Sequence, residues 1–214
     1  MECGFIEQTD RGLQCEFNNI FSFESTEVYI TESNRSIDAV SFRKSELFSV
    51  PSDLFRNFPQ LKHLDVEATL LKVIRADDFK NAKELKYFLA RFNDIVELKS
   101  RIFTNCPSLK FIVLQYNEIT NIELNAFDGI LHLEALYLDY NKVKTLPSRI
   151  LHSLENLVHF SMTFNNLTNI PNDLFVANDK LETLNLGNNL LASFDEKQFE
   201  SLPNLERFDF NHNR

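Results

Sequence analysis

A short alternation of apolar and polar residues recurs along most of the chain at a fixed distance. It is clear in LYLDYNKVKTLP, residues 136–147, and returns 24 residues earlier as IVLQYNEITNI and 24 residues later as FSMTFNNLTNIP. Alignment on the leading apolar residue gives eight repeats without an insertion, starting at Ile37, Leu61, Leu85, Leu109, Leu133, Leu157, Leu181 and Leu205. A constant period of this length is typical of proteins built from stacked repeats.

Within each repeat, positions four and six are apolar, as in Leu136 and Leu138. This period of two predicts that each repeat opens with a short strand that turns one face to the core, while positions three, five and seven face solvent. Position nine is Asn in six repeats and Ser45 or Thr69 in the first two. A short polar side chain there can satisfy backbone groups where the chain leaves the strand. Position nineteen is apolar in the seven complete repeats: Phe55, Phe79, Phe103, Phe127, Leu151, Phe175 and Phe199.

This consensus, L-x-x-L-x-L-x-x-N-x-L, resembles the leucine-rich repeat, specifically the 24-residue class of animal extracellular proteins. The resemblance covers residues 37–214. It implies an α/β solenoid of horseshoe shape, with a parallel concave sheet and mostly loops and short helical turns on the convex side. We predict two regions: an N-terminal cap over 1–36, and a solenoid over 37–214 with seven full repeats and a truncated eighth.

The expected cap carries two cysteines, Cys3 and Cys15, on either side of a turn at Thr9–Gly12. A hairpin closed by a Cys3–Cys15 disulfide would cover the open edge of the first repeat, which a solenoid needs; free thiols are the alternative. A disulfide implies an oxidising compartment. The cap resembles those of secreted insect leucine-rich repeat proteins, some with immune roles, so we expect an extracellular protein, either secreted or the ectodomain of a membrane protein.

Three further residues belong with this extracellular expectation. Asn34 and Asn166 begin glycosylation sequons, although about this many arise by chance. Cys106 has no predicted partner, and we interpret it as a small buried residue, with an intermolecular disulfide as the alternative. The sequence ends inside a strand pattern, so we expect more protein or a partner to cover that end.

The candidate binding surface comes from position eight, which is aromatic in four consecutive repeats: Phe92, Tyr116, Tyr140 and Phe164. Because parallel strands lie about 4.8 Å apart, these rings should form a stacked column at the edge of the concave sheet. Ring packing alone could explain the column. An exposed apolar patch with a polar rim, however, usually marks an interaction site. We therefore predict that the partner-binding residues are this column and its neighbours Tyr87, Arg91, Phe111, Gln115, Tyr137, Asp139, His159 and Thr163.

Composition and charge narrow the function. A net charge of -9 argues against nucleic-acid binding and against anionic membrane surfaces. No apolar run approaches the ~18 residues of a membrane span. His63 and His159 lie four repeats apart, too far to share a metal, and no catalytic constellation has a plausible spacing. We expect no enzyme activity, cofactor or metal.

Our leading hypothesis is a non-enzymatic extracellular recognition module. It would bind a protein or peptide on its concave face, with innate immunity as one expected setting. The alternative is an adhesion or scaffold protein, or a fragment of a receptor ectodomain, that assembles through its C-terminal end and forms a homo-oligomer.

Overall fold

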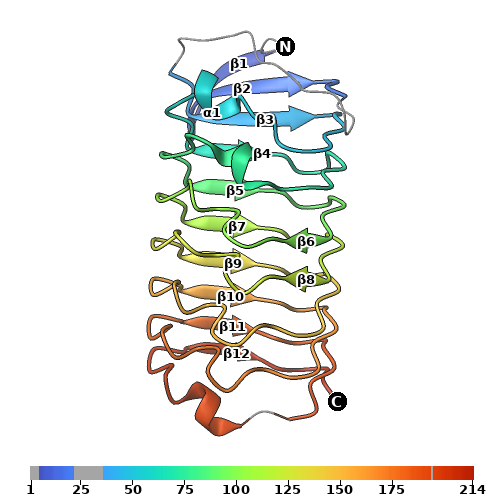
Figure 1. The fold of residues 1–214 in the computed structure, drawn as a ribbon, viewed down its shortest axis with the longest axis vertical. Helices are drawn as coiled ribbons and strands as arrows, with labels where there is room; N and C mark the ends of the chain where they lie inside the picture. The colour runs from blue at the N-terminus through green and yellow to red at the C-terminus, as the bar shows by residue number, and fades with distance from the viewer. Residues whose placement is uncertain (1–4, 22–35, 194) are drawn as a thin grey trace.

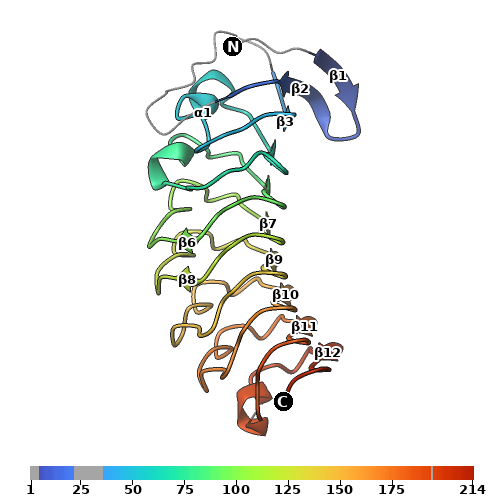
Figure 2. The same cartoon turned by 90° about the vertical axis from the view of Figure 1, so that its right-hand side faces the viewer.

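The chain forms an elongated solenoid whose strands stack along its long axis (Figure 1). The computed structural model describes residues 5–21, 36–193 and 195–214. One sheet of ten strands runs in the order β1-β2-β3-β4-β5-β7-β9-β10-β11-β12. Seen from the side, the strand face curves inward, because β1 and β12 project further than β7 in the middle (Figure 2). The predicted solenoid with a parallel concave sheet is confirmed.

Each repeat contributes one strand to this sheet. The strands are β3 (Ala39–Arg43), β4 (His63–Asp65), β5 (Tyr87–Leu89), β7 (Phe111–Val113), β9 (Ala135–Tyr137), β10 (His159–Ser161), β11 (Thr183–Asn185) and β12 (Arg207–Asp209). Paired residues are 24 positions apart, as in Leu136 and Phe160. Because the register equals the sequence period, each position of the repeat forms a straight column across the sheet.

The convex side is mostly loops and turns. It holds a short helix α1 (Leu54–Asn57), the 3-10 helices η1 (Ala76–Phe79) and η2 (Glu196–Phe199), and a parallel pair, β6 (Glu97–Leu98) with β8 (Asn121–Ile122). Between the two sides lies one continuous core. Phe55, Phe79, Phe103, Phe127 and Phe175 line it, and their side chains are at most 1% exposed.

The asparagine at position nine joins neighbouring repeats through the backbone. In Asn141, Oδ1 accepts from the Ile119 N–H at 2.9 Å. Its Nδ2 donates to the carbonyls of Leu114 at 2.9 Å and Leu138 at 3.0 Å. The same contacts recur along the array, for example where Asn165 Oδ1 accepts from the Val143 N–H at 3.1 Å. The predicted role of this position, satisfying backbone groups where the chain leaves the strand, is confirmed.

An antiparallel hairpin of β1 (Phe5–Thr9) and β2 (Gly12–Asn18) adjoins the first repeat, and β2 pairs in parallel with β3. Cys15 is fully buried in the common core. Cys3 and Asn34 lie outside the described residues, so the Cys3–Cys15 disulfide and glycosylation at Asn34 stay predictions.

Cys106 is a free, buried thiol, and burial raises its pKa well above the ordinary range. It is therefore out of reach of an intermolecular disulfide.

Candidate interaction surface

Four aromatic side chains form a continuous stack at the exit of the strands. The ring centroids of Phe92 and Tyr116 lie 4.5 Å apart, those of Tyr116 and Tyr140 4.2 Å, and those of Tyr140 and Phe164 4.3 Å. The interplanar angles are 18°, 9° and 8°. This is the aromatic column predicted from position eight of the repeat.

The backbone beneath the column is left-handed. Tyr116 and Tyr140 have φ of 56° and 55°, and the other residues at position eight, including Lys44 and Ala68, share this conformation. It lets the Tyr116 N–H donate to the carbonyl of Asp139 at 3.0 Å in the next repeat. A left-handed backbone costs an L-residue about 1–2 kcal/mol. Each ring pair returns about 0.5–1.5 kcal/mol. All eight repeats have the left-handed conformation at position eight, so it does not depend on an aromatic side chain there. Only these four repeats carry Phe or Tyr at that position.

Stacking decides what the aromatic column presents to solvent. The inner rings cover each other's faces, and the hydroxyls of Tyr116 and Tyr140 lie within hydrogen-bonding reach of each other. The exposed fractions are 53% for Phe92, 41% for Tyr116, 38% for Tyr140 and 45% for Phe164. Only the outer faces of Phe92 and Phe164 have no ring of the column against them. The column is thus a rigid apolar ridge with two hydroxyls at its centre.

A second aromatic stack lies on the concave face at position three. His63 and Tyr87 have ring centroids 4.3 Å apart, and Tyr87 and Phe111 lie 4.9 Å apart, with interplanar angles of 3° and 10°. All three side chains are half-buried. Desolvation lowers the pKa of His63, which favours the neutral ring in this stack. We predicted Tyr87 and Phe111 as surface residues, but the sequence analysis missed that His63 continues their column.

Tyr137, the predicted central anchor, is also half-buried on the concave face. Burial, reinforced by the charge of Asp139, raises the pKa of its phenol, so the hydroxyl stays protonated at neutral pH. Val113, at the same position of the preceding repeat, is only 5% exposed. His159 is half-buried two residues before the buried Ser161. The concave face thus offers less apolar area than the alternation alone suggested, because neighbouring side chains cover one another.

Asp139 requires a correction, because position seven was expected to face solvent. Its side chain is only 4% exposed. Its carboxylate accepts from Gln115 Nε2 at 2.6 Å, from the Thr163 N–H at 2.9 Å and Oγ1 at 2.8 Å, and from the hydroxyl of Ser161. Because its carboxylate accepts these hydrogen bonds, Asp139 positions Gln115 and Thr163, which stay half-buried at the surface, while its own side chain is almost fully buried.

Arg91 is the one predicted site residue with a positive charge, and it remains accessible. Its side chain is 43% exposed, and its Nε lies 3.6 Å from Glu67 Oε1. That nitrogen is buried and has no hydrogen-bond partner. Burial raises the pKa of Glu67, with Arg91 opposing the shift. Arg91 therefore places a partly exposed cation between the concave stack and the aromatic column.

Comparison with known proteins places this geometry in a family. The family profile of the BspA-type leucine-rich repeat region, with six copies, matches residues 14–117 and 96–213. The chain belongs to this family. Among curated protein sequences, none matches significantly. The finer resemblance to secreted insect proteins stays a prediction.

Solved structures agree on the leucine-rich repeat fold. A structure of a TLR13–ssRNA13 complex superposes with a TM-score of 0.69 at 24% identity, covering 83% of this chain and 26% of that one. For the mouse RP105/MD-1 complex the values are 0.73, 22%, 82% and 30%. A leucine-rich repeat protein of Leptospira interrogans gives 0.71, 26%, 84% and 44%. This leucine-rich repeat chain spans less than half the length of each. Because one neighbour is a complex with RNA, the shared fold does not support excluding nucleic acid.

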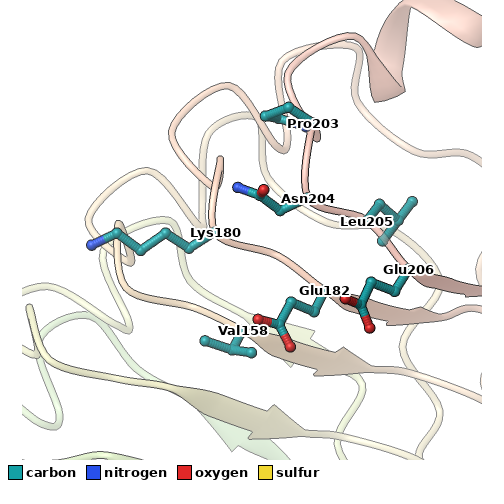
Figure 3. Close-up of a pocket in the computed structure, with 7 residues that line it drawn as sticks. All are labelled: Val158, Lys180, Glu182, Pro203, Asn204, Leu205 and Glu206. Carbon is teal, nitrogen blue, oxygen red and sulfur yellow. The ribbon is translucent and has the colours of Figure 1, made fainter.

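One hollow of this leucine-rich repeat protein shares no lining residue with either stack. It has a volume of about 550 Å³ and lies at the entry to the last strands (Figure 3). Glu182 and Glu206 point the same way along it, and Lys180 points away.

No group of three or more His, Cys, Asp or Glu side chains among the described residues could hold a metal ion. Within the same residues, no helix is long and apolar enough to cross a membrane.

Asn166, the predicted glycosylation site within the described residues, lies two residues after Phe164 and is half-buried. Thr168 of the same sequon is exposed. A glycan on Asn166 would stand beside the Phe164 end of the aromatic column. Its presence stays a prediction.

Proposed function

We propose that this chain is a non-enzymatic, extracellular recognition module that binds a protein or peptide. The partner would contact the aromatic column and the adjoining concave face of repeats three to six. The observation that carries the proposal is the column itself, in which four stacked and exposed rings follow one another without a gap. A soluble protein that needed only ring packing would gain as much from stacking the same rings inside its core.

The surface has the rigidity and size that a protein partner requires. Each inner ring is held between two others, and Asp139 holds Gln115 and Thr163, so little side-chain entropy would be lost on binding. The four strands of repeats three to six span roughly 14 Å and all eight roughly 34 Å, so a partner centred on repeats three to six can extend over the neighbouring strands to reach the ~800 Å² of a standard interface. The site residues are the aromatic column with Tyr87, Arg91, Phe111, Gln115, Tyr137, His159 and Thr163, while Asp139 serves as their support.

The arrangement of the rings also favours a protein over a nucleic acid. Recognition of single strands relies on bases stacking on free aromatic faces within a positive groove. Here the inner rings cover each other's faces, and the chain carries a net charge of -9. An extracellular setting with a role in immunity is supported by the TLR13 and RP105 neighbours. A Cys3–Cys15 disulfide and glycans at Asn34 and Asn166 would accompany that setting.

The test is a selection from an unbiased library of displayed peptides. Peptides enriched on the unmodified chain are measured against Phe111→Ser/Tyr137→Ser and against Tyr116→Ser/Tyr140→Ser. We expect most enriched peptides to lose at least about tenfold in affinity for one of the two pairs, because buried aromatic anchors dominate interface energies. A matched control is Val176→Ser, which removes an exposed apolar side chain from the convex side. Enriched peptides that bind all variants equally would refute the proposal.

A second candidate function has one specific observation in its favour. Phe208 stands at position four, where the other repeats bury their side chains almost completely, yet it is 39% exposed. Phe210 beside it is only partly buried. An adhesion or scaffold protein, or a receptor ectodomain, would bury Phe208 and Phe210 by assembly with another chain. Light scattering coupled to size exclusion tests it. A dimer of the unmodified chain that becomes a monomer in Phe208→Ser supports assembly, and a monomer at all concentrations refutes self-assembly.

A further inference from the structure

The aromatic column lacks one ring at its N-terminal end. Position eight of the repeat before Phe92 is Ala68, which is exposed and has φ of 53°, the conformation of the column residues. The Ala68 N–H donates to the carbonyl of Arg91 at 2.9 Å, just as the Phe92 N–H donates to Gln115 at 3.2 Å. Ala68 thus occupies the next step of the same ladder, with a methyl group where the other four carry rings.

Because of this gap, one face of Phe92 has no ring beside it. Among the described residues, Phe92 stacks on Tyr116 alone, whereas Tyr140 stacks on both of its neighbours. The exposed fractions follow this difference, with 53% for Phe92 and 38% for Tyr140. At the other end of the column, the residue next to Phe164 is Asn188, a larger and half-buried side chain. Of the two ends of the column, the Phe92 end therefore has the smaller neighbouring side chain, Ala68, beside its free ring face.

The residues around the Ala68 step differ from their equivalents along the column. Position ten is polar beside the four rings (Asp94, Glu118, Lys142 and Asn166), but beside Ala68 it is Leu70, with 47% of its surface exposed. The step beyond Ala68 carries Lys44, which is exposed. Two steps of the ladder measure about 9.6 Å. The steps of Phe92 and Lys44 are thus far enough apart for one further ring at the observed stacking distance.

We propose that the protein partner inserts an aromatic side chain above Ala68, stacked on Phe92 and facing Lys44, so that it completes the column. A ring carries negative potential on its faces, which suits stacking on one side and an ammonium group on the other. Leu70 would contact its apolar edge. An aliphatic side chain would gain neither the stacking nor the cation–π contact. A carboxylate would pair with Lys44, but its charge would lose hydration against the apolar side chains of Phe92 and Leu70, which disfavours binding. This inference rests on the proposed function and specifies the partner's anchor.

The probe for this site is N-acetyl-tryptophanamide. The chain contains no Trp, so every indole signal comes from the probe. With the ¹⁵N-labelled chain and millimolar probe, we expect saturable amide shifts centred on Ala68, Leu70 and Phe92. Ala68→Tyr fills the gap with a backbone that already has the φ of Tyr116 and Tyr140, and should abolish these shifts. The matched control Asn188→Tyr adds a ring at the opposite end and should preserve them. Lys44→Met should weaken binding about two- to fivefold, from the ~0.5–1 kcal/mol of an exposed cation–π contact.

Shifts that persist in Ala68→Tyr, or that centre on Phe164, would overturn the inference. The displayed peptides separate its failure from that of the proposed function. Peptides that are lost on the Phe111/Tyr137 or Tyr116/Tyr140 variants and also on Ala68→Tyr support both. If peptides lose affinity for either double variant and yet bind Ala68→Tyr normally, this result overturns only the inserted ring. The same conclusion follows for peptides that keep their affinity when their own aromatic residues are replaced by Ala. Peptides indifferent to all of these substitutions overturn both.

Discussion

Replacing Asn141 by Ala tests how the repeats are held together, and its cost can be worked out from single hydrogen bonds. Asn141 is 5% exposed and bonds one N–H and two close carbonyls. The carbonyl of Leu114 also accepts from Asn117 at 3.1 Å, and that of Leu138 from Asn165 at 2.9 Å. After the substitution, the Ile119 N–H is therefore the one group of the three without a hydrogen-bond partner.

The expected loss follows from this difference. A buried N–H without a partner costs about 1–3 kcal/mol, and each of the two hydrogen bonds lost at a carbonyl that keeps another donor costs about 0.5–1.5 kcal/mol. Together they lower the free energy of unfolding by about 4 kcal/mol, with ~2 kcal/mol as the lower bound. Asn213→Ala is the matched control. Asn213 makes the equivalent bonds to Leu191, Leu186 and Phe210, but it is only half-buried, so water can replace them at a cost below about 1.5 kcal/mol.

The assay is guanidinium unfolding followed by far-ultraviolet circular dichroism, with the free energy taken from the midpoint and the slope m. An unchanged m shows that the array still unfolds as one unit, which a repeat protein can fail to do. A loss below about 1 kcal/mol for Asn141→Ala, or equal losses for the two variants, would refute the view that buried asparagines clamp adjacent repeats.

Three further predictions concern a backbone position, a buried carboxyl and the thiols. Ala68→Gly should stabilise the fold by about 0.5–1 kcal/mol in the same unfolding assay, because glycine relieves the left-handed backbone and no stacking is lost; a destabilised variant would contradict this. Burial raises the pKa of Asp78 from 3.8 to about 6, so the native state binds the proton more tightly than the unfolded state. Lowering the pH from 7 towards 4 should therefore stabilise the native protein relative to Asp78→Asn, by at most about 3 kcal/mol, and a difference between the two proteins that is the same at pH 7 and pH 5 would contradict it. Alkylation in denaturant without reductant should label Cys106 alone, and intact mass showing three labels would exclude the Cys3–Cys15 disulfide.

Much of the fold could be predicted from the sequence because the repeat makes one local rule apply eight times. Leu136 and Leu138 alone are ambiguous, but the same alternation every 24 residues predicts strands, their parallel register and the columns across them. The stacked column from Phe92 to Phe164 follows from that register. The role of Asn141 follows as well, since a short amide is suited to the backbone groups where a strand ends.

The remainder of the site depends on how side chains of neighbouring repeats share space. The alternation places Asp139 on the solvent side, yet Gln115, Ser161 and Thr163 surround its carboxylate and bury it. Likewise, Val113 is covered on a face expected to be open, and His63 joins Tyr87 because its ring can lie parallel to the next one.

The sequence by itself therefore determined the solenoid, its register and the place of the aromatic residues, because these follow from a period and from the geometry of a strand. Only the tertiary structure decided which of those residues remain accessible. Exposure depends on contacts between side chains 24 residues apart. The repeat register shows which side chains are neighbours in a column, but it does not show which of them bury the others. The free face of Phe92 above Ala68 is such a feature: its neighbours are plain in the sequence, but the stacking that covers the inner faces and leaves this one open exists only in the folded array.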